Sequence, residues 1–360
     1  MSVRYQAVQW NPQKRAYDSV VAAGVIGFLA MFIGTSAVAF PDATAETLLI
    51  RAFGTAAFAL LHLILCIGPL CRLAPWFLPL LYNRRHLGVT MFLLAAGHGT
   101  LSMVHFHALG DSDMLASVIS ANPRIDSISQ FPFQPLGLAA LAILFVMAAT
   151  SHDFWLANLT APVWKALHMG VYIAYALLVA HVALGALQSE PSVLYAATLS
   201  GGMLLVIGLH GLAARREAPG DHTAPLEAEA QVETDGFVAV CRLDEIQENR
   251  AHVVSLSGER VAVFRYGNKV SAVSNVCQHQ NGPLGEGRIV DGCITCPWHG
   301  YQYAPDTGRS PEPFTEQIPT FRVRIEGDTI YLHPEPNPPG TLVEPARIAS
   351  DTAPRGEFNG

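Results

Sequence analysis

Charged residues are scarce in this chain of 360 residues: they make up 14% of the sequence, whereas an ordinary soluble domain contains about 25%. The scarcity is confined to one part of the chain. Residues 1–213 contain 9 Lys and Arg and 8 Asp and Glu, while residues 214–360 contain 13 and 21. This distribution excludes a single soluble globular protein and indicates a membrane part followed by an acidic soluble part. A basic surplus is also missing, which excludes a nucleic-acid-binding protein, because such a protein needs a positive surface to meet phosphate.

Two further features are missing. The six cysteines form no disulfide framework of the secreted type, which agrees with a reducing cytosol. No Gly-x-Gly-x-x-Gly sequence opens a strand–helix unit, so the sequence predicts no dinucleotide-binding domain.

Long apolar runs fill the first part of the chain. A hydrocarbon core of about 30 Å needs about 20 helical residues, and only helices satisfy the backbone hydrogen bonds of a lone span in lipid. Six stretches are long enough: Val20–Phe40, Ala52–Cys71, Leu87–Leu109, Phe133–Ser151, Val163–Leu187 and Val193–Ala214.

The loops between these stretches predict an orientation, because Lys and Arg favour the cytoplasmic side. With the N-terminus inside, the outer side holds only Arg51 and Arg124. The inner side holds nine basic residues: Arg4, Lys14, Arg15, Arg72, Arg84, Arg85, Lys165, Arg215 and Arg216. The sequence therefore predicts a multi-pass protein of the plasma (inner) membrane with both termini in the cytoplasm.

The residues after the last span change in character. Residues 215–235 form a polar, acidic linker, and residues 236–333 show short alternating runs separated by turn residues such as Ser257-Gly258. Residues 334–360 are rich in proline and small residues and predict a mobile tail. The predicted architecture is an all-α six-helix membrane bundle (residues 1–214) followed by an all-β domain.

The all-β domain carries two pairs of metal-binding side chains, in Cys277-Gln-His279 and in Cys296-Pro-Trp-His299. Zinc also accepts two Cys and two His, but a Cys-x-His first pair is unusual for a zinc finger. The spacing, within loops rich in glycine and proline, resembles a Rieske [2Fe–2S] domain. In that family the two cysteines hold one iron and the two histidines hold the other.

The same loops indicate a subtype. Rieske proteins of quinol-oxidising complexes carry an extra Cys in each loop and a Ser after the His-Gly pair, where this chain has Gly282, Trp298 and Tyr301. Fewer hydrogen bonds to the cluster sulfurs lower its potential. The domain therefore resembles the low-potential ferredoxins that supply electrons to oxygenases.

Nine of the 14 histidines precede residue 214, and histidine inside a span indicates function. His168 and His181 lie on the fifth span, about 20 Å apart along its axis, and His98 lies on the third at nearly the depth of His181. Imidazoles on facing helices are how a membrane bundle holds b-type haem.

Several sequences around these histidines resemble the ferric reductase-like transmembrane domain: Asn83-Arg-Arg-His-Leu-Gly88, Thr150-Ser-His-Asp153 and Trp164-Lys-Ala-Leu-His168 followed by Tyr172. The resemblance implies that His98, His168 and His181 bind haem. Many family members have four ligands and two haems, and the fourth position here is open between His86 and His62. His86 lies 12 residues before His98, so it points about 120° away from it, and one haem is the simpler expectation.

These features predict a membrane protein that passes single electrons between a cytosolic Rieske cluster and b-type haem. A soluble cytosolic reductase would be the donor, a quinone or a periplasmic protein the acceptor, and the reverse flow stays open. The alternative is a membrane-anchored Rieske ferredoxin that serves a cytosolic oxygenase or reductase, with no functional haem. A substrate-converting iron site needs two His and a carboxylate, and only His333 follows His299, so no complete catalytic site is predicted.

Overall fold

The computed structural model describes residues 12–108, 110–159, 161–189, 192–217, 235–279 and 281–348. The chain divides between Arg216 and Glu217 into two compact units, called here the membrane unit and the β unit. The predicted linker at 215–235 falls for the most part outside the described residues, apart from the helical residues up to Glu217.

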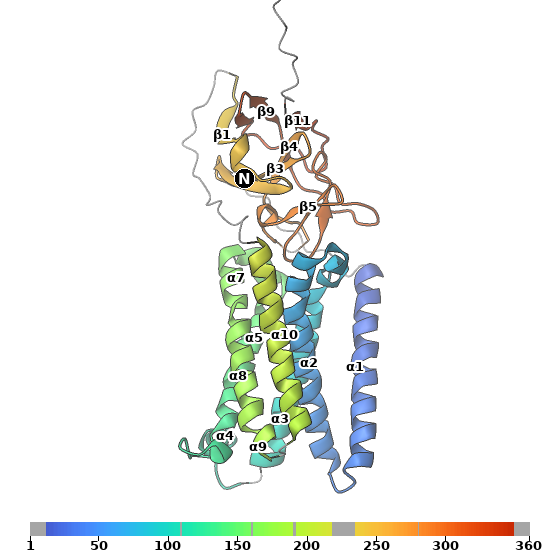
Figure 1. Cartoon of the computed structure of the whole chain (residues 1–360), viewed down its shortest axis with the longest axis vertical. Helices are drawn as coiled ribbons and strands as arrows, with labels where there is room; N and C mark the ends of the chain where they lie inside the picture. The colour runs from blue at the N-terminus through green and yellow to red at the C-terminus, as the bar shows by residue number, and fades with distance from the viewer. Residues whose placement is uncertain are drawn as a thin grey trace, which may run out of the picture. The chain divides into compact units, whose positions relative to one another are not determined.

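Six helical segments of the membrane unit are long and apolar enough to cross a membrane, which confirms the six predicted spans (Figure 1). The fifth is interrupted at Met169 and at Gly185 and therefore contains three helices. The long helices are α1 (Pro12–Ala39), α2 (Ala45–Leu73), α3 (Arg84–His107), α5 (Phe133–Thr150), α7 (Ala161–His168) with α8 (Gly170–Leu184) and α9 (Ala186–Ser189), and α10 (Val193–Glu217). Short helices lie between them: η1 (Pro75–Leu81), α4 (Met114–Ser120), η2 (Ile128–Gln130) and α6 (Asp153–Asn158).

The bundle core lies between α2, α3, α5, α8 and α10. Its buried residues are mostly aliphatic or small, including Leu61 and Leu65 of α2, Leu144 of α5 and Ala174 of α8. Small residues allow close approach of helices in lipid, where packing replaces the hydrophobic effect as the driving force.

Helix α1 stands at the edge of the bundle (Figure 1), and large apolar side chains along it such as Val20 and Val38 are exposed. A polar contact joins it to α3: the Asp18 carboxylate lies 2.8 Å from His86 Nδ1 and accepts a hydrogen bond from Asn83 Nδ2. Asp18 therefore ties α1 to the loop that begins α3.

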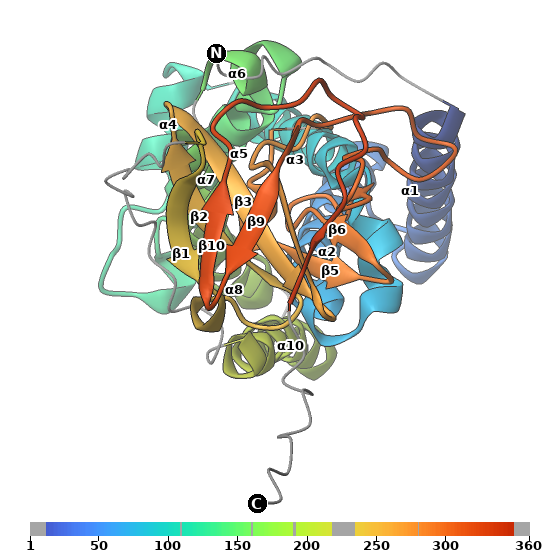
Figure 2. The same ribbon diagram turned by 90° about the horizontal axis from the view of Figure 1, so that it is seen from above.

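The β unit contains three antiparallel sheets, with strand orders β1-β10-β9, β11-β4-β3-β2 and β5-β6-β7, while β8 also pairs with β4. Figure 2 shows β10 between β1 and β9. The strands are β1 (Val238–Arg242), β2 (Arg250–Leu256), β3 (Glu259–Tyr266), β4 (Lys269–Ser274), β5 (Arg288–Val290), β6 (Cys293–Thr295), β7 (Gln302–Tyr303), β8 (Thr320–Phe321), β9 (Val323–Glu326), β10 (Thr329–Leu332) and β11 (Ala346–Arg347). Short 3-10 helices follow β1 (Leu243–Glu245) and precede β5 (Leu284–Glu286). The first two sheets share a core that includes Val254, Val261 and Ile330. The architecture confirms the predicted fold class, a six-helix membrane part followed by an all-β domain.

Tight turns hold the long hairpins of the β unit in register. Ser257 and Gly258 both have positive φ, of 51° and 81°, and connect β2 to β3. Two-residue hairpin turns need this left-handed conformation, because it matches the twist of the flanking strands. The predicted turn at this position thus aligns β2 with β3 over seven residue pairs.

The segment after Pro334 differs from the predicted mobile tail. Residues 334–348 pack along the β unit: Asn337 N–H donates to Thr320 O, Arg309 Nε to Gly340 O, and β11 pairs with β4. A proline-rich composition disfavours regular structure, but the remaining amide groups can still bond to a neighbouring sheet. Residues 349–360 lie outside the described residues.

This packing predicts that residues 334–348 stabilise the β unit. A chain ended at His333 loses the bonds from Asn337 and to Gly340 and the pairing of β11, each worth about 1 kcal/mol. We expect its thermal midpoint to fall by about 5 °C or more relative to a chain ended at Ile348. Differential scanning calorimetry of the two detergent-purified chains measures this shift, and equal midpoints would contradict the structure.

Candidate functional site

Two loops of the β unit have the same backbone geometry, and each begins with a cysteine. In the first, between β4 and β5, Cys277 N–H donates to Gly282 O, and Asn281 N–H donates to Cys277 O. In the second, between β6 and β7, Cys296 N–H donates to Tyr301 O, and Gly300 N–H donates to Cys296 O.

The fourth residue after each cysteine has positive φ, 57° at Asn281 and 65° at Gly300. The two loops therefore present Cys277 and Cys296 in equivalent positions.

The structure brings the four predicted ligands into one buried group. Cys277, His279 and Cys296 are fully buried, and His299 is 5% exposed. Cys296 Sγ lies 4.0 Å from His299 Nδ1, and the two imidazole centroids lie 5.2 Å apart at an interplanar angle of 76°. Burial, and then the neighbouring Cys277 sulfur, raises the pKa of the Cys296 thiol well above its usual value. Such thiols ionise readily only when a metal compensates their charge.

The distance between the imidazoles tests whether a metal fits. A metal–imidazole bond of about 2 Å, with about 1 Å more to the ring centre, places each centroid about 3 Å from the metal. Two rings at a tetrahedral angle then lie about 5 Å apart, which matches the 5.2 Å between His279 and His299.

Among the described residues, no three His, Cys, Asp or Glu are arranged around one metal ion. Two pairs of ligands, one of sulfur and one of nitrogen, are what the two irons of a Rieske cluster require.

Gly282 leaves room for this group, because a Cβ at this position would lie 2.6 Å from Cys296 Sγ. The first loop therefore needs a glycine at this position, because the second loop approaches it closely. A cysteine at the Gly282 position, as in disulfide-bearing Rieske domains, would need the sulfur of Cys296 to move.

Two tyrosines that follow the second loop support the ligands. Tyr303 is fully buried, and its hydroxyl lies 3.4 Å from Cys277 Sγ. Burial, and then the Cys277 sulfur, raises the pKa of Tyr303, so its O–H keeps its proton and would donate to the sulfur of a metal-bound Cys277. The expectation of few hydrogen bonds to the sulfurs missed this one. In the sequence, only the alternation of side chains along β7 indicates this hydrogen bond, because it turns Tyr303 inward two residues after Tyr301.

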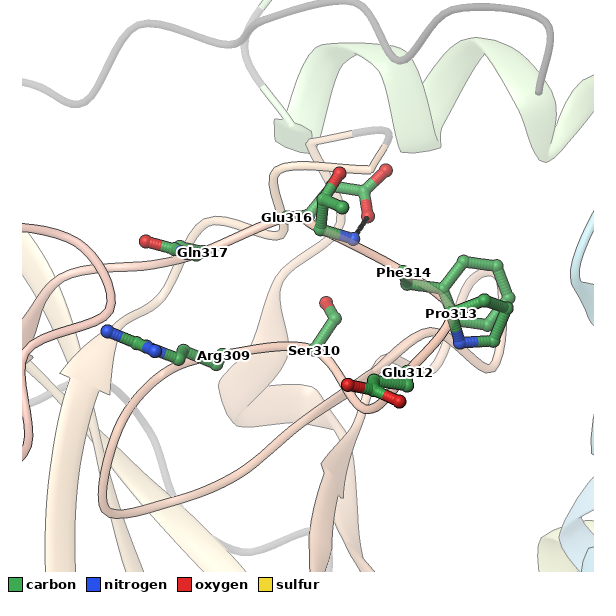
Figure 3. A pocket seen from close by; sticks show the side chains of 8 residues that line it. Arg309, Ser310, Glu312, Pro313, Phe314, Glu316 and Gln317 are labelled. Atoms are coloured by element: carbon green, nitrogen blue, oxygen red, sulfur yellow. Dashed lines mark hydrogen bonds between the residues drawn. The ribbon is translucent and has the colours of Figure 1, made fainter.

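Tyr301 stacks on the ligand His279, with ring centroids 4.6 Å apart and planes at 6°. Its hydroxyl donates to the Glu316 carboxylate, and its ring also meets Phe314. Glu316 and Phe314 belong to the loop from Arg309 to Gln317, which lines a groove of about 460 Å³ (Figure 3). This loop therefore holds Tyr301 flat against His279.

In the membrane unit, His98 of α3 and His181 of α8 face each other, with imidazole centroids 6.4 Å apart and planes at 83°. The Nδ1–H of His98 donates to Ile50 O at 2.9 Å, and that of His181 donates to Phe133 O at 2.9 Å. The Nε2 atom of neither ring has a hydrogen-bond partner among the described residues. Two rings on opposite sides of one metal lie about 6 Å apart, so this pair fits the axial positions of a haem iron.

The other candidate histidines have protein partners. Both nitrogens of His168 are engaged, Nδ1 with Trp164 O at 3.0 Å and Nε2 with Ser151 Oγ at 3.3 Å. Both nitrogens of His62 are engaged as well, with Phe58 O and with the Tyr175 hydroxyl.

His86 faces α1, where its Nδ1 pairs with the Asp18 carboxylate. The structure thus brings together His98 and His181, but among the residues it describes no imidazole faces His62, His86 or His168.

Comparison with known protein families identifies both parts of the chain. Residues 236–322 match the Rieske [2Fe-2S] domain, and residues 53–179 match the ferric reductase like transmembrane component. Both resemblances found in the sequence are thereby confirmed.

Similar proteins include ferredoxins of oxygenase systems. The alkene monooxygenase system ferredoxin component of Xanthobacter autotrophicus is 25% identical over 103 residues, which cover 28% of this chain and 84% of that protein. The anthranilate 1,2-dioxygenase ferredoxin subunit of Burkholderia cepacia is 33% identical over 85 residues, or 23% of this chain and 78% of the relative. Among solved structures, the ferredoxin of carbazole 1,9a-dioxygenase from Nocardioides aromaticivorans is 27% identical and covers 28% of this chain and 98% of its own, with a TM-score of 0.26.

The two ferredoxins match about a quarter of the chain, whereas the membrane unit matches a separate family. The chain belongs to the Rieske ferredoxin family and joins this electron-transfer domain to a ferric reductase-like transmembrane component.

Proposed function

We propose that this protein carries single electrons between a Rieske [2Fe–2S] cluster on the cytosolic side and one b-type haem inside the membrane. The observation that carries the proposal is the pair of His98 and His181, whose Nδ1 atoms are fixed on backbone carbonyls and whose Nε2 atoms have no partner among the described residues. An imidazole that donates one N–H to a carbonyl presents its other nitrogen, in a fixed tautomer, to a metal.

Cys277 and Cys296 hold one iron of the cluster in this proposal, and His279 and His299 hold the other. When bound, the cluster and the haem each take up and release one electron. The chain's own residues bury the ligands, exclude water from them and hold Tyr303 as a hydrogen-bond donor to Cys277.

The orientation follows from the basic residues at the helix ends. Arg72 ends α2, Arg84 and Arg85 begin α3, and Arg215 lies in the last turn of α10, all at the end of the bundle that the positive-inside rule assigns to the cytoplasm. His98 follows Arg84 by 14 residues, or about 21 Å of helix, so the haem site lies in the outer half of the span.

A soluble cytosolic reductase supplies the electron in this proposal, and a quinone or a periplasmic protein accepts it at the outer side. The chain itself shows no nucleotide-binding signature, so the two-electron chemistry of a nicotinamide belongs to the donor.

A second candidate function is a membrane-anchored Rieske ferredoxin that serves a cytosolic oxygenase and binds no haem. The names of the relatives favour it, since they are ferredoxin components of a monooxygenase and a dioxygenase. Haem content separates the two functions, because a ferredoxin that only delivers electrons in the cytosol needs no cofactor in its membrane part.

The haem proposal predicts a b-type signal in the reduced-minus-oxidised optical spectrum of the detergent-purified protein. Replacement of His98 or His181 by Ala removes one axial ligand and is expected to abolish low-spin haem, while His86→Ala, which removes the contact with Asp18, leaves it in place. Pyridine haemochrome and iron analysis count the cofactors per chain. A protein that contains only the two cluster irons would establish the ferredoxin function instead.

The Tyr303 hydroxyl is predicted to raise the midpoint potential of the cluster, because a donor to a ligand sulfur favours the more negative, reduced state. A hydrogen bond worth about 1 kcal/mol corresponds to about 40 mV for one electron. We therefore expect Tyr303→Phe to lower the potential by tens of millivolts in an EPR-monitored redox titration.

Tyr266→Phe is the matched control for Tyr303→Phe, because the Tyr266 hydroxyl bonds to Ser271 Oγ and not to a cluster ligand. Equal shifts in the two variants would show that the Tyr303 bond does not tune the cluster.

A further inference from the structure

The two helix pairs that carry the haem histidines share one geometry. In α2 and α3, His98 donates to the carbonyl of Ile50, which lies 48 residues earlier. In α5 and α8, His181 donates to the carbonyl of Phe133, which also lies 48 residues earlier. The second arrangement therefore repeats the first at an offset of 83 residues.

A glycine lies one turn after each carbonyl, at the same offset. A Cβ on Gly54 would lie 2.8 Å from His98 Nδ1, and a Cβ on Gly137 would lie 2.8 Å from both Nδ1 and Cε1 of His181. Any larger side chain at either position would push the imidazole away from its carbonyl, since contacts under 3.0 Å are not tolerated.

The sequence around the two glycines repeats as well. Residues 54–61 are GTAAFALL and residues 137–144 are GLAALAIL, identical at five of eight positions. Burial follows the same pattern, with Ala57 and Leu61 buried in α2 and Ala140 and Leu144 buried in α5. The likeness thus covers sequence, packing and hydrogen bonding together.

We propose that the membrane unit contains two copies of one helix-pair module, α2–α3 and α5–α8, and that Gly54 and Gly137 are positioning residues that each seat one axial histidine of a shared haem. The proposal rests on the proposed function, because it names the residues that position the same two proposed haem ligands. Each module supplies half of the site, and the carbonyl and the glycine together set the tautomer and the plane of the ring.

The same offset of 83 residues also relates residues at the inner end of the bundle. His168 corresponds to Arg85, and Ser151, which bonds His168, corresponds to Gly68. The guanidinium of Arg84 lies beside Gly68, 3.6 Å from the place of a Cβ. At the positions equivalent to His168 and Ser151 the first module therefore has no imidazole, and the duplication predicts one haem per chain.

The test uses alanine substitutions in the full-length, detergent-purified protein. Gly54→Ala and Gly137→Ala are each expected to lower haem per chain by more than half and to replace the low-spin EPR signal of the remainder with a high-spin one. Gly208→Ala in α10 is the matched control, because nothing lies within 4 Å of a Cβ there. Alanine is the better helix former, so a loss of helix propensity cannot explain a defect.

A double-mutant cycle on thermal stability tests the contact without haem. Gly54→Ala should lower the thermal midpoint of haem-free protein in the parent chain but not in a His98→Ala background, where no ring remains to be displaced. Gly137→Ala and His181→Ala should behave in the same way.

The outcomes separate the two proposals. Parent protein without haem would overturn the proposed function, while the cycle would still decide the seating of the histidines. Wild-type haem content and low-spin signals in both glycine variants, together with additive stability effects, would overturn the module proposal. Two haems per parent chain would overturn its inner-end prediction.

Discussion

The arrangement of the membrane unit depends on how a half-buried imidazole within a membrane span satisfies its two nitrogens. Water is absent from the hydrocarbon region, so each ring nitrogen needs a partner in the protein or in a cofactor. Both ring nitrogens of His62 and of His168 have protein partners. In His98 and His181, by contrast, only Nδ1 bonds to a carbonyl, and the two ring centroids lie 6.4 Å apart. Because of this difference, and not because of the number of histidines, we propose this one pair as haem ligands.

In the β unit the same constraint applies to sulfur, because a buried group there also needs a partner. Cys277 and Cys296 are buried, and a buried thiol is reluctant to ionise unless a metal takes its charge. The two loops use one backbone design to bring both sulfurs together, and Gly282 supplies the space between them. Around this group, Tyr303 donates to a sulfur, and Tyr301, held by Glu316, covers His279.

Much of this could be predicted from sequence because the signals are local. The spans follow from length and hydropathy, and the ligands of the β unit follow from the spacing of Cys277, His279, Cys296 and His299. The pairing of His181 with His98 and the partners of His62 could not be predicted with certainty, because they depend on helix rotation and on contacts such as Tyr175 with His62, 113 residues apart. The sequence did not predict the packing of residues 334–348. A proline-rich composition indicates that a segment lacks regular structure, but it does not indicate whether the segment contacts the rest of the domain.

The likeness between the two helix pairs is carried by small and apolar residues that are common in any span, so composition and hydropathy do not reveal it. It becomes visible only when the contacts of Gly54 and Gly137 are compared. Small differences at equivalent positions, such as Arg85 in place of a histidine, then explain why one end of the bundle has a facing imidazole pair and the other does not.

We propose above all that electrons pass between the cluster and the haem of one chain. The most direct test is anaerobic stopped-flow reduction of the purified protein by a reductase, with cluster and haem absorbance followed together. We expect haem reduction to follow cluster reduction at a rate independent of protein concentration. We also expect it to be lost in a Cys277→Ala variant whose haem dithionite still reduces. Haem reduction at an unchanged rate in that variant would contradict electron transfer through the cluster.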